Sequence, residues 1–334
     1  MSLKKIAEAA GTSISTVSRV LSGSAPNCAS PQLRDKIWKA ARELHYTPNL
    51  YARNLKKGAP AQNRPRSVSI VLARIFSLED DPFFGELFRS LESELLASDC
   101  VLERVIEAKE TLPADFTHAD GIFILGRCSE RLLKNLRGVS ENLVGIWRNH
   151  SNFDVDEVLC DGQKAACTAM EHLYALGHRQ IGYIGDCSHE SRYLGYCDFM
   201  MKHALPLDYQ YILPTNQTRE QGHSAFERLI ALPELPSALL CANDITALGV
   251  LDGLSAMGKR ARPELSVISI DNIALSQECR PMLTTINIPK EDMAHMAVQL
   301  LLDRIARRHR EFVRIELPCR LIRRESCRKI SPSS

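Results

Sequence analysis

Residues 6–21 read IAEAAGTSISTVSRVL, a pattern of two short helices joined by a tight turn. Apolar residues recur at i, i+3, i+4 and i+7 from Leu3, and Gly11 ends this first run. Ser13 can cap the second helix through its hydroxyl. That helix turns three apolar residues inward: Val17, Val20 and Leu21. Its outward face carries Ile14, Ser15, Ser18 and Arg19. The arrangement is a helix-turn-helix pattern.

A third helix is predicted after this pair. Ser30-Pro31 is a capping serine followed by a proline at the first helical position. An apolar stripe with helical spacing then runs through Leu33, Ile37, Ala40, Ala41 and Leu44. Three short helices are therefore expected to share one small core.

The N-terminal segment is strongly basic. Residues 1–66 contain 12 Lys or Arg against 3 acidic residues, a net charge of +9, whereas the remainder contains 30 against 37, a net charge of −7. Lys and Arg gain affinity for nucleic acid by displacing counterions condensed on phosphate, so this segment favours a polyanionic partner. The alternative is a solubilising arm.

The composition is that of a soluble globular protein with two or three domains. The chain has 334 residues, of which 45% are hydrophobic and 25% charged. No run approaches the ~20 consecutive apolar residues that a bilayer span needs. The first residues are followed by Glu8 and not by the apolar core of a signal peptide, so we expect a cytoplasmic protein. The 11 Cys include no C-x-x-C pair, which favours buried reduced thiols over disulfides or zinc ligands.

Together with YTPNLYARNL at residues 46–55, the stretch at 6–21 resembles the lactose-repressor/galactose-repressor (LacI/GalR) family of bacterial transcription regulators. The similarity runs over nearly the whole chain. It implies a sequence-specific DNA-binding regulator, a homodimeric repressor of a carbohydrate-utilisation operon that a sugar inducer releases. Two alternatives stay open: a corepressor-dependent regulator that binds a purine or phosphorylated metabolite, and a small-molecule binding protein without DNA function.

In a helix-turn-helix, the first residues of the second helix meet base edges in the major groove. Ile14, Ser15 and Arg19 are the predicted base readers, since Ile14 can contact a thymine methyl and the Arg19 fork matches guanine. Thr16 and Ser18 are predicted to bond phosphate, although Ser18 can instead bond its own helix backbone. The family often carries larger polar residues at positions 14 and 15, which leaves base choice open.

By the resemblance, a hinge helix follows the head. Its span, Asn49–Leu55, is shorter than the ~12 to 15 residues that an isolated helix needs to be stable in water. We therefore expect this segment to become helical only when it is bound to DNA. Leu55 of each subunit is expected to enter the minor groove as a wedge, the alternative being a packing leucine between domains. The predicted DNA contacts of this segment are Asn49, Ala52, Arg53 and Leu55.

From Val68 onward, short apolar runs alternate with helical stretches. The runs are 68–72, 121–125, 143–147, 181–185, 238–241 and 267–270. Such alternation favours parallel sheets covered by helices. The fold class is therefore an all-α helix-turn-helix head plus an α/β body. By the resemblance, that body is two-lobed and periplasmic-binding-protein-like, with the ligand between its lobes.

The expected domain organisation has four parts. They are a helix-turn-helix domain (1–47), a hinge helix and linker (48–66), an effector-binding and dimerisation domain (67–327) and a tail (328–334). The lobes of the body are expected to combine 67–160 with 289–317, and 161–288 with 318–327.

Three polar residues match, by the resemblance, the positions that hold sugar hydroxyls in sugar-responsive members: Arg192, Asn243 and Asp271. An Arg fork and an Asp carboxylate can grip a vicinal diol with charge-assisted hydrogen bonds. The alternatives are an interlobe salt bridge between Arg192 and Asp271, and a helix cap for Asn243.

Phe83, Trp147 and Arg148 complete the expected effector site. The two aromatic side chains can present an apolar face to a sugar ring, with core packing as the alternative for Phe83. Sugar-responsive relatives often place an Asp just after the strand at 143–147, where this chain has Arg148. That residue favours an acidic or phosphorylated sugar, the alternative being a solvated surface Arg.

Sequence motifs of catalysis are absent: there is no G-x-S-x-G, G-x-x-x-x-G-K-[ST] or H-E-x-x-H, and the His residues lack ligand spacing. We therefore expect no enzymatic activity, no metal and no cofactor. The expected partners are double-stranded operator DNA, a small-molecule effector and a second copy of the chain, with no membrane. No leucine heptads follow the body, which disfavours a tetramer through a coiled coil.

Overall fold

The computed structural model describes the chain in eight stretches, namely 3–22, 29–43, 66–73, 78, 81–108, 110–188, 190–257 and 264–330. The predicted hinge contacts lie outside them: Asn49, Ala52, Arg53 and Leu55. None of the helices in the described stretches combines the length and hydropathy that a membrane span requires.

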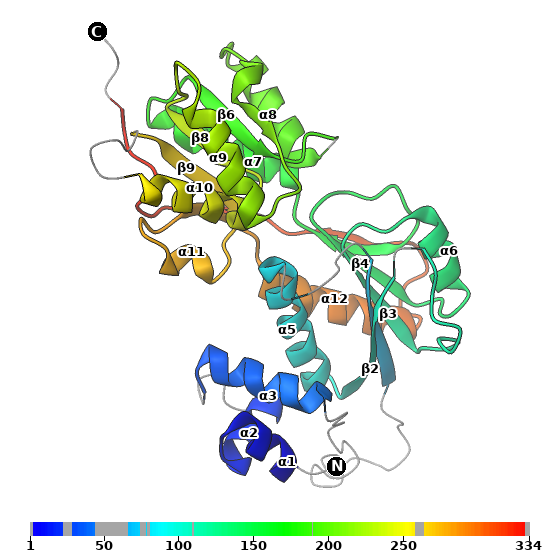
Figure 1. Ribbon diagram of the computed structural model, residues 1–334. Coiled ribbons are helices and arrows are strands. Elements are labelled where there is room, and N and C mark those ends of the chain that lie inside the picture. The colour runs from blue at the N-terminus through cyan, green and yellow to red at the C-terminus, as the bar shows by residue number, and fades with distance from the viewer. Residues whose placement is uncertain are drawn as a thin grey trace. The chain divides into compact units, whose positions relative to one another are not determined.

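In its described residues, 3–22 and 29–43, the head shows three short helices around one core (Figure 1). They are α1 (Leu3–Ala10), α2 (Ile14–Ser22) and α3 (Pro31–Glu43). The buried core residues are Ile6, Ala7, Ala10, Val17, Val20, Leu21, Ile37, Ala40 and Ala41. Gly11 makes the turn after α1 with a φ of +65°, a conformation that glycine adopts without steric cost. The helix-turn-helix prediction is therefore confirmed.

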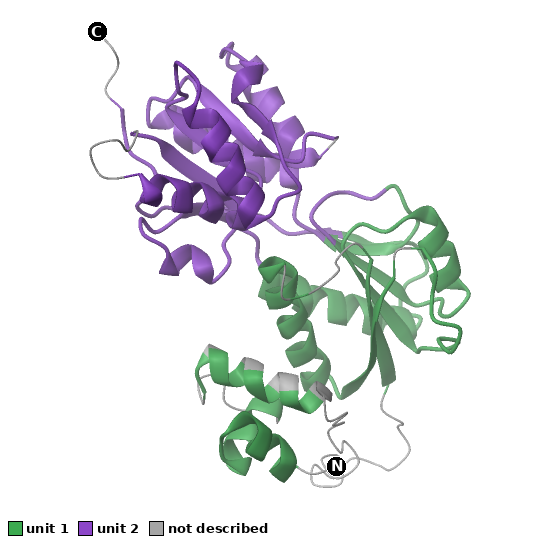
Figure 2. Cartoon of the chain, in the orientation of Figure 1, with its two compact units in different colours: residues 1–146, 152–158, 290–314 green, residues 147–151, 159–289, 315–334 purple. Residues whose placement is uncertain are grey.

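The chain divides into two compact units (Figure 2). Unit 1 contains residues 1–146, 152–158 and 290–314. Unit 2 contains residues 147–151, 159–289 and 315–334.

The first sheet has the strand order β11-β5-β4-β3-β1-β2. Its strands are β1 (Arg66–Leu72), β2 (Cys100–Glu107), β3 (Gly121–Leu125), β4 (Leu143–Trp147), β5 (Asp156–Leu159) and β11 (Arg314–Glu316). Parallel pairing joins β1 to β2 and β3, and β3 to β4. The accompanying helices are α5 (Pro82–Ala97), α6 (Glu130–Arg137) and α12 (Lys290–Ile305), with α5 and α12 packed side by side (Figure 1).

The second sheet has the strand order β12-β10-β9-β8-β6-β7. Its strands are β6 (Ile181–Gly185), β7 (Ile212–Pro214), β8 (Ala238–Cys241), β9 (Ser266–Asp271), β10 (Thr284–Asn287) and β12 (Arg320–Ile322). The pairs from β7 through β10 are parallel, whereas β12 runs antiparallel to β10. Its helices are α7 (Gly162–Ala175), α8 (Ser191–Lys202), η1 (Tyr209–Tyr211), α9 (Arg219–Ile230), α10 (Asp244–Ala256) and α11 (Leu275–Glu278).

Every apolar run predicted as a strand is one, and the predicted α/β fold class is confirmed. Edge and short strands were not predicted from sequence. β2 lies at one end of its sheet and alternates buried Cys100 and Ile106 with exposed Glu103 and Val105. Because one face of an edge strand meets water, charged residues interrupt its sequence, and it lacks the continuous apolar run by which the buried strands were predicted.

Two glycines allow α9 and α10 to pack closely. A Cβ at Gly249 would overlap the carbonyl oxygen of Arg219, and a Cβ at Gly222 would overlap that of Thr246. Any side chain at these positions would push the helices apart. The contact fixes the N-terminal end of α10, which begins directly after a predicted site residue, Asn243.

Asp156 anchors a buried charge network in unit 1. Its fully buried carboxylate accepts two hydrogen bonds from Arg304, at 2.8 and 2.6 Å, one from the His309 ring at 2.9 Å and one from the Val313 amide at 2.8 Å. Burial alone would raise the pKa of Asp156, but these hydrogen bonds lower it below its usual value of 3.8. The network ties β5 to α12 and to the segment that leads into β11.

Asp156→Asn should destabilise the fold and reduce its acid sensitivity. A carboxyl group with a lowered folded-state pKa contributes stability above its unfolded pKa, and that stability is lost as the pH falls through the folded value. We expect the substitution to cost about 3–5 kcal/mol of unfolding free energy at pH 7, because Arg304 keeps a buried charge without its counter-charge. Urea unfolding followed by circular dichroism at pH 7 and pH 3 measures both effects.

The matched control is Asp115→Asn. Arg104 hydrogen-bonds Asp115 and lowers its pKa, but this carboxylate is 74% exposed. The control should therefore change stability little. An Asp156→Asn protein as stable as wild type at pH 7 would contradict the role assigned to the network.

Candidate functional site

The second helix of the head presents an exposed polar face. Ile14 is 48% exposed, and the exposed side chains of α2 include four predicted DNA contacts: Ile14, Ser15, Ser18 and Arg19. Thr16 is half-buried, and its backbone amide donates to Ser13 Oγ at 3.1 Å. The Thr16 hydroxyl also lies 2.8 Å from Ser13 Oγ. Thr16 is therefore held at the start of the helix, beside the face that the other four residues form.

In unit 2, the predicted effector residue Arg192 is deeply buried and fully engaged. Its side chain is 4% exposed and pairs with Glu190, Nε to Oε1, at 2.8 Å. Its Nη1 donates to the carbonyl oxygen of Ala242 at 2.6 Å, and Nη2 donates to Oε1 of Gln217 at 2.9 Å. Burial alone would lower the pKa of Arg192, but the Glu190 carboxylate raises it, so the guanidinium stays charged.

Glu190 links Arg192 to a further loop. It caps α8 by accepting from the Arg192 backbone amide at 3.0 Å, and its Oε1 accepts from Asn149 Nδ2 at 3.2 Å. A Cβ at Gly162 would lie 2.5 Å from Asn149 Oδ1 and 3.2 Å from Arg192 Cγ. Only a residue without a side chain fits between these two groups, so α7 starts directly against the cluster.

Asn243 lies beside Arg192 as the N-cap of α10. Its Oδ1 accepts from the Thr246 amide at 3.0 Å, and its Nδ2 donates to the carbonyl oxygen of Gln217 at 3.3 Å. The helix-cap alternative for Asn243 is therefore confirmed. Gln217 contacts both residues, because its side chain accepts from Arg192 and its backbone accepts from Asn243.

Arg148 and Asp271 form a second buried pair in unit 2. Arg148 Nη2 lies 3.2 Å from Asp271 Oδ2, and the side chains are 15% and 3% exposed. The alternative interpretation of Arg148 as a solvated surface residue is therefore wrong, because the strand end places it against a carboxylate. The alternative of an interlobe salt bridge between Arg192 and Asp271 is also wrong: both residues belong to unit 2, where Arg192 pairs with Glu190 and Asp271 pairs with Arg148.

The backbone at the end of β9 is strained. Asp271 has a φ of +130° and the following Asn272 a φ of +52°, conformations that favour glycine. Such residues cost about 1–3 kcal/mol each and gather at binding sites. The strain marks the Asp271 carboxylate as a group held in a special position.

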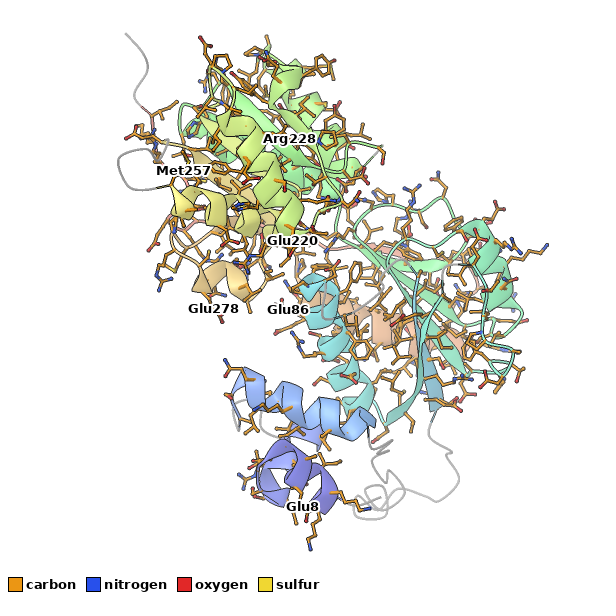
Figure 3. The ribbon with its side chains drawn as sticks, in the orientation of Figure 1. Glu8, Glu86, Glu220, Arg228, Met257 and Glu278 are labelled. Carbon is orange, nitrogen blue, oxygen red and sulfur yellow. The ribbon has the colours of Figure 1, made fainter. Side chains whose placement is uncertain are left out.

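The two predicted aromatic residues are buried. Phe83, 1% exposed, belongs to unit 1 and meets Phe84 edge to face at 5.1 Å between ring centroids. Lys290 Nζ lies 5.5 Å from the Phe83 ring centroid and 3.3 Å from Glu86, which Figure 3 labels on α5. Trp147, at the end of β4, is 4% exposed. The core-packing alternative accounts for Phe83.

Unit 2 thus gathers seven polar residues, called the polar cluster below: Arg148, Asn149, Glu190, Arg192, Gln217, Asn243 and Asp271. Sequence reasoning missed three of them. Glu190 carried a signal, an acid two residues before an Arg at a helix start. Gln217 carried none, because its contacts join loops distant in sequence.

The comparisons with known proteins agree with this geometry. Residues 2–49 match the model of "Bacterial regulatory proteins, lacI family", and residues 170–327 match that of a "Periplasmic binding protein-like domain". The HTH-type transcriptional repressor CytR of Escherichia coli (strain K12) is 31% identical over 98% of this chain and 96% of its own length. The chain belongs to the lacI family. It is a DNA-binding transcriptional regulator, and the resemblance stated from sequence is confirmed.

Further members of the lacI family extend the similarity. The repressor PurR of Erwinia tasmaniensis is 27% identical over 97% of this chain and 96% of its own length. Among solved structures, a complex of the regulator CelR with cellobiose has a TM-score of 0.68 at 24% identity, over 98% of this chain and 100% of that one. The lac repressor dimer bound to operator and an anti-inducer has a TM-score of 0.66 at 22% identity, with 98% of each chain covered. These structures share the fold.

Within this lacI-family chain, Glu190→Ala should destabilise unit 2 strongly, because it leaves the buried Arg192 without a counter-charge. We expect a loss of about 3–5 kcal/mol in unfolding free energy. The matched control is Asp252→Ala, which breaks the Arg219–Asp252 pair, whose side chains are 48% and 46% exposed. That control should cost about 1 kcal/mol or less.

Urea unfolding followed by circular dichroism compares the two variants. Glu190→Gln, which keeps the cap but loses the charge, serves if the alanine variant does not fold, and should fall between the alanine variant and wild type. Equal stabilities of the Glu190 and Asp252 variants would contradict the assigned role of Glu190.

Proposed function

We propose that the chain is a homodimeric, cytoplasmic repressor that binds an operator through its head and is released by a small neutral effector bound at the polar cluster. The exposed face of α2, set on a buried three-helix core in a segment of net charge +9, carries this proposal. The sequence identity of 31% with the repressor CytR supports it. The proposal includes no catalytic step, so the effector leaves unchanged.

The head would read DNA in two ways. Its Lys and Arg residues displace counterions from phosphate and supply affinity without regard to sequence. On the exposed face, Arg19 offers a fork of donors for guanine, Ser15 and Ser18 offer hydroxyls, and Ile14 offers an apolar contact for a thymine methyl. Two heads on a dimer would then bind a pseudo-palindromic operator, with half-sites spaced by the protein's two-fold symmetry.

Arg19→Ala should weaken operator binding about tenfold or more while leaving binding to random duplex nearly unchanged, because it removes a base contact. Lys36→Ala is the control, since Lys36 is exposed on α3 and its loss removes the same charge. Arg19→Lys should keep the charge but lose the fork. Fluorescence anisotropy with an operator selected in vitro from random duplexes, and with a scrambled duplex, measures all three. Equal losses on both duplexes for Arg19→Ala would overturn the base-reading role.

The polar cluster favours a neutral, hydroxyl-rich effector. Two arginine charges are balanced by two carboxylates, in the pairs Arg192–Glu190 and Arg148–Asp271. Because the formal charges of these four side chains sum to zero, they offer hydrogen-bond donors and acceptors without a net charge. Such a site suits sugar hydroxyls better than a carboxylate or phosphate. Proteins of this fold hold cellobiose and ribose in their solved structures, which supports a sugar. The earlier inference of an acidic sugar from Arg148 loses its basis, since Asp271 neutralises that charge.

An effector can act on DNA binding only through differential affinity. It would have to bind the polar cluster more tightly in the conformation that disfavours operator binding, and so shift the population towards it. A corepressor would do the reverse and tighten operator binding. The sign of the change in operator affinity on adding ligand therefore separates the two mechanisms.

A panel of neutral sugars, uronates and sugar phosphates should contain stabilising ligands only among the neutral sugars. A ligand at 100 times its Kd should add about 2.7 kcal/mol to the unfolding free energy, which a thermal shift assay detects. Asp271→Asn should abolish the shift, whereas Asp252→Asn, at an exposed carboxylate, should leave it intact. Stabilisation confined to uronates or phosphates would overturn the neutral-ligand assignment.

A further inference from the structure

Three potential metal ligands meet in unit 2, outside the polar cluster. They are His150, Asp161 and Glu316, whose ligand atoms all lie within 4.8 Å of one another. His150 belongs to the segment 147–151, Asp161 directly precedes α7, and Glu316 ends β11. These residues come from three separate parts of the chain, so folding and not local sequence brings them together.

The distances suit a tetrahedral metal ion. His150 Nε2 lies 3.6 Å from Asp161 Oδ2 and 4.0 Å from Glu316 Oε2. Metal–ligand bonds of about 2.0–2.1 Å place tetrahedral ligand atoms about 3.3–3.4 Å apart. Since all three atoms lie within 4.8 Å of one another, changes of up to about 1.5 Å in their separations would bring them into coordination, which side-chain rotation can supply.

The carboxylate of Asp161 is already oriented for this role. Its Oδ1 accepts hydrogen bonds from the amides of Gln163 at 2.8 Å and Lys164 at 3.3 Å, because Asp161 is the N-cap of α7. Its other oxygen faces His150. Such outer contacts hold a ligand in place and reduce the entropy that binding costs. The side chain of Asp161 is 14% exposed and that of His150 43%, which leaves an entry path.

Lys164 is the competitor for this position. Its Nζ lies 2.6 Å from Glu316 Oε1 and 4.0 Å from Asp161 Oδ2, where its charge partly balances the two carboxylates. The side chain is 66% exposed and can swing into solvent. A divalent ion would replace it with a larger charge and direct bonds to both acids.

We propose that His150, Asp161 and Glu316 form a binding site for a divalent transition metal such as Zn²⁺, with water completing the coordination. An imidazole nitrogen with two carboxylates suits Zn²⁺, whereas Mg²⁺ and Ca²⁺ prefer all-oxygen sites. All three ligands lie close in sequence to points where the chain passes between its two units. A bound ion would therefore cross-link the connecting segments and couple metal availability to the effector-binding unit.

The test is calorimetric titration of the full-length, metal-free protein with ZnCl₂. One saturable site per chain is expected. His150→Ala and Glu316→Gln should each weaken binding by about 10- to 100-fold, and Lys164→Met should strengthen it. The matched control is His223→Ala, because His223 lies 3.7 Å from the carboxylate of Glu227 and belongs to no such triad among the residues that the structure describes. Unfolding by urea checks that every variant is folded.

Cobalt substitution distinguishes this site from binding by thiols. Co²⁺ held by nitrogen and oxygen ligands should give weak visible bands, without the intense near-ultraviolet band of thiolate ligation. No saturable Zn²⁺ binding, a thiolate band, or wild-type affinity in the His150→Ala protein would each overturn the proposal.

Discussion

Burying the guanidinium of Arg192 removes a charge from water, at a cost of several kcal/mol unless hydrogen bonds and a counter-charge compensate it. The compensation comes from Glu190 ahead of α8, Gln217 ahead of α9, and the Ala242 carbonyl ahead of α10. Because one rigid fork bonds all three, the starts of three helices are fixed relative to one another. Because the Arg192 side chain needs all of these partners, few rearrangements of the surrounding loops are tolerated. The remaining residues of the polar cluster are arranged around it.

The parallel sheet explains why these groups can meet. Gly185, Cys241 and Asp271 end the strands β6, β8 and β9, whose carboxyl ends lie along one edge of the sheet, and ligands bind at such edges in open α/β folds. The close packing of α9 on α10 at Gly222 and Gly249 fixes the helix that Asn243 caps. The same elements therefore form the scaffold and hold the polar cluster. The strand ends supply its residues, and the tight packing of the helices limits their movement.

Sequence patterns predicted the buried parts of this fold better than its edges. Runs such as 121–125 and 181–185 are strands with the predicted ends, because strands buried on both faces are apolar throughout. β2 was missed because one face of it meets solvent.

In the site, resemblance led to Arg192, Asn243 and Asp271, but their partners were not predictable. Which carboxylate compensates which arginine depends on loop positions that only the folded chain sets. The Arg148–Asp271 pair spans 123 positions of sequence.

The basic segment 1–66 and the polar cluster, which we propose as the effector site, use charge in opposite ways. The basic segment 1–66 carries a net charge of +9, which attracts any duplex and gains affinity from counterion release, so its binding weakens steeply with salt. In the polar cluster the charges are paired and buried, where salt screens them little, so selectivity there depends on shape and hydrogen-bond geometry. Residues 67–334 carry −7 and repel phosphate, which favours DNA contact by the segment 1–66. Ligand and DNA can therefore be bound by one chain without competing for the same groups, and any influence of one on the other must pass through its conformation.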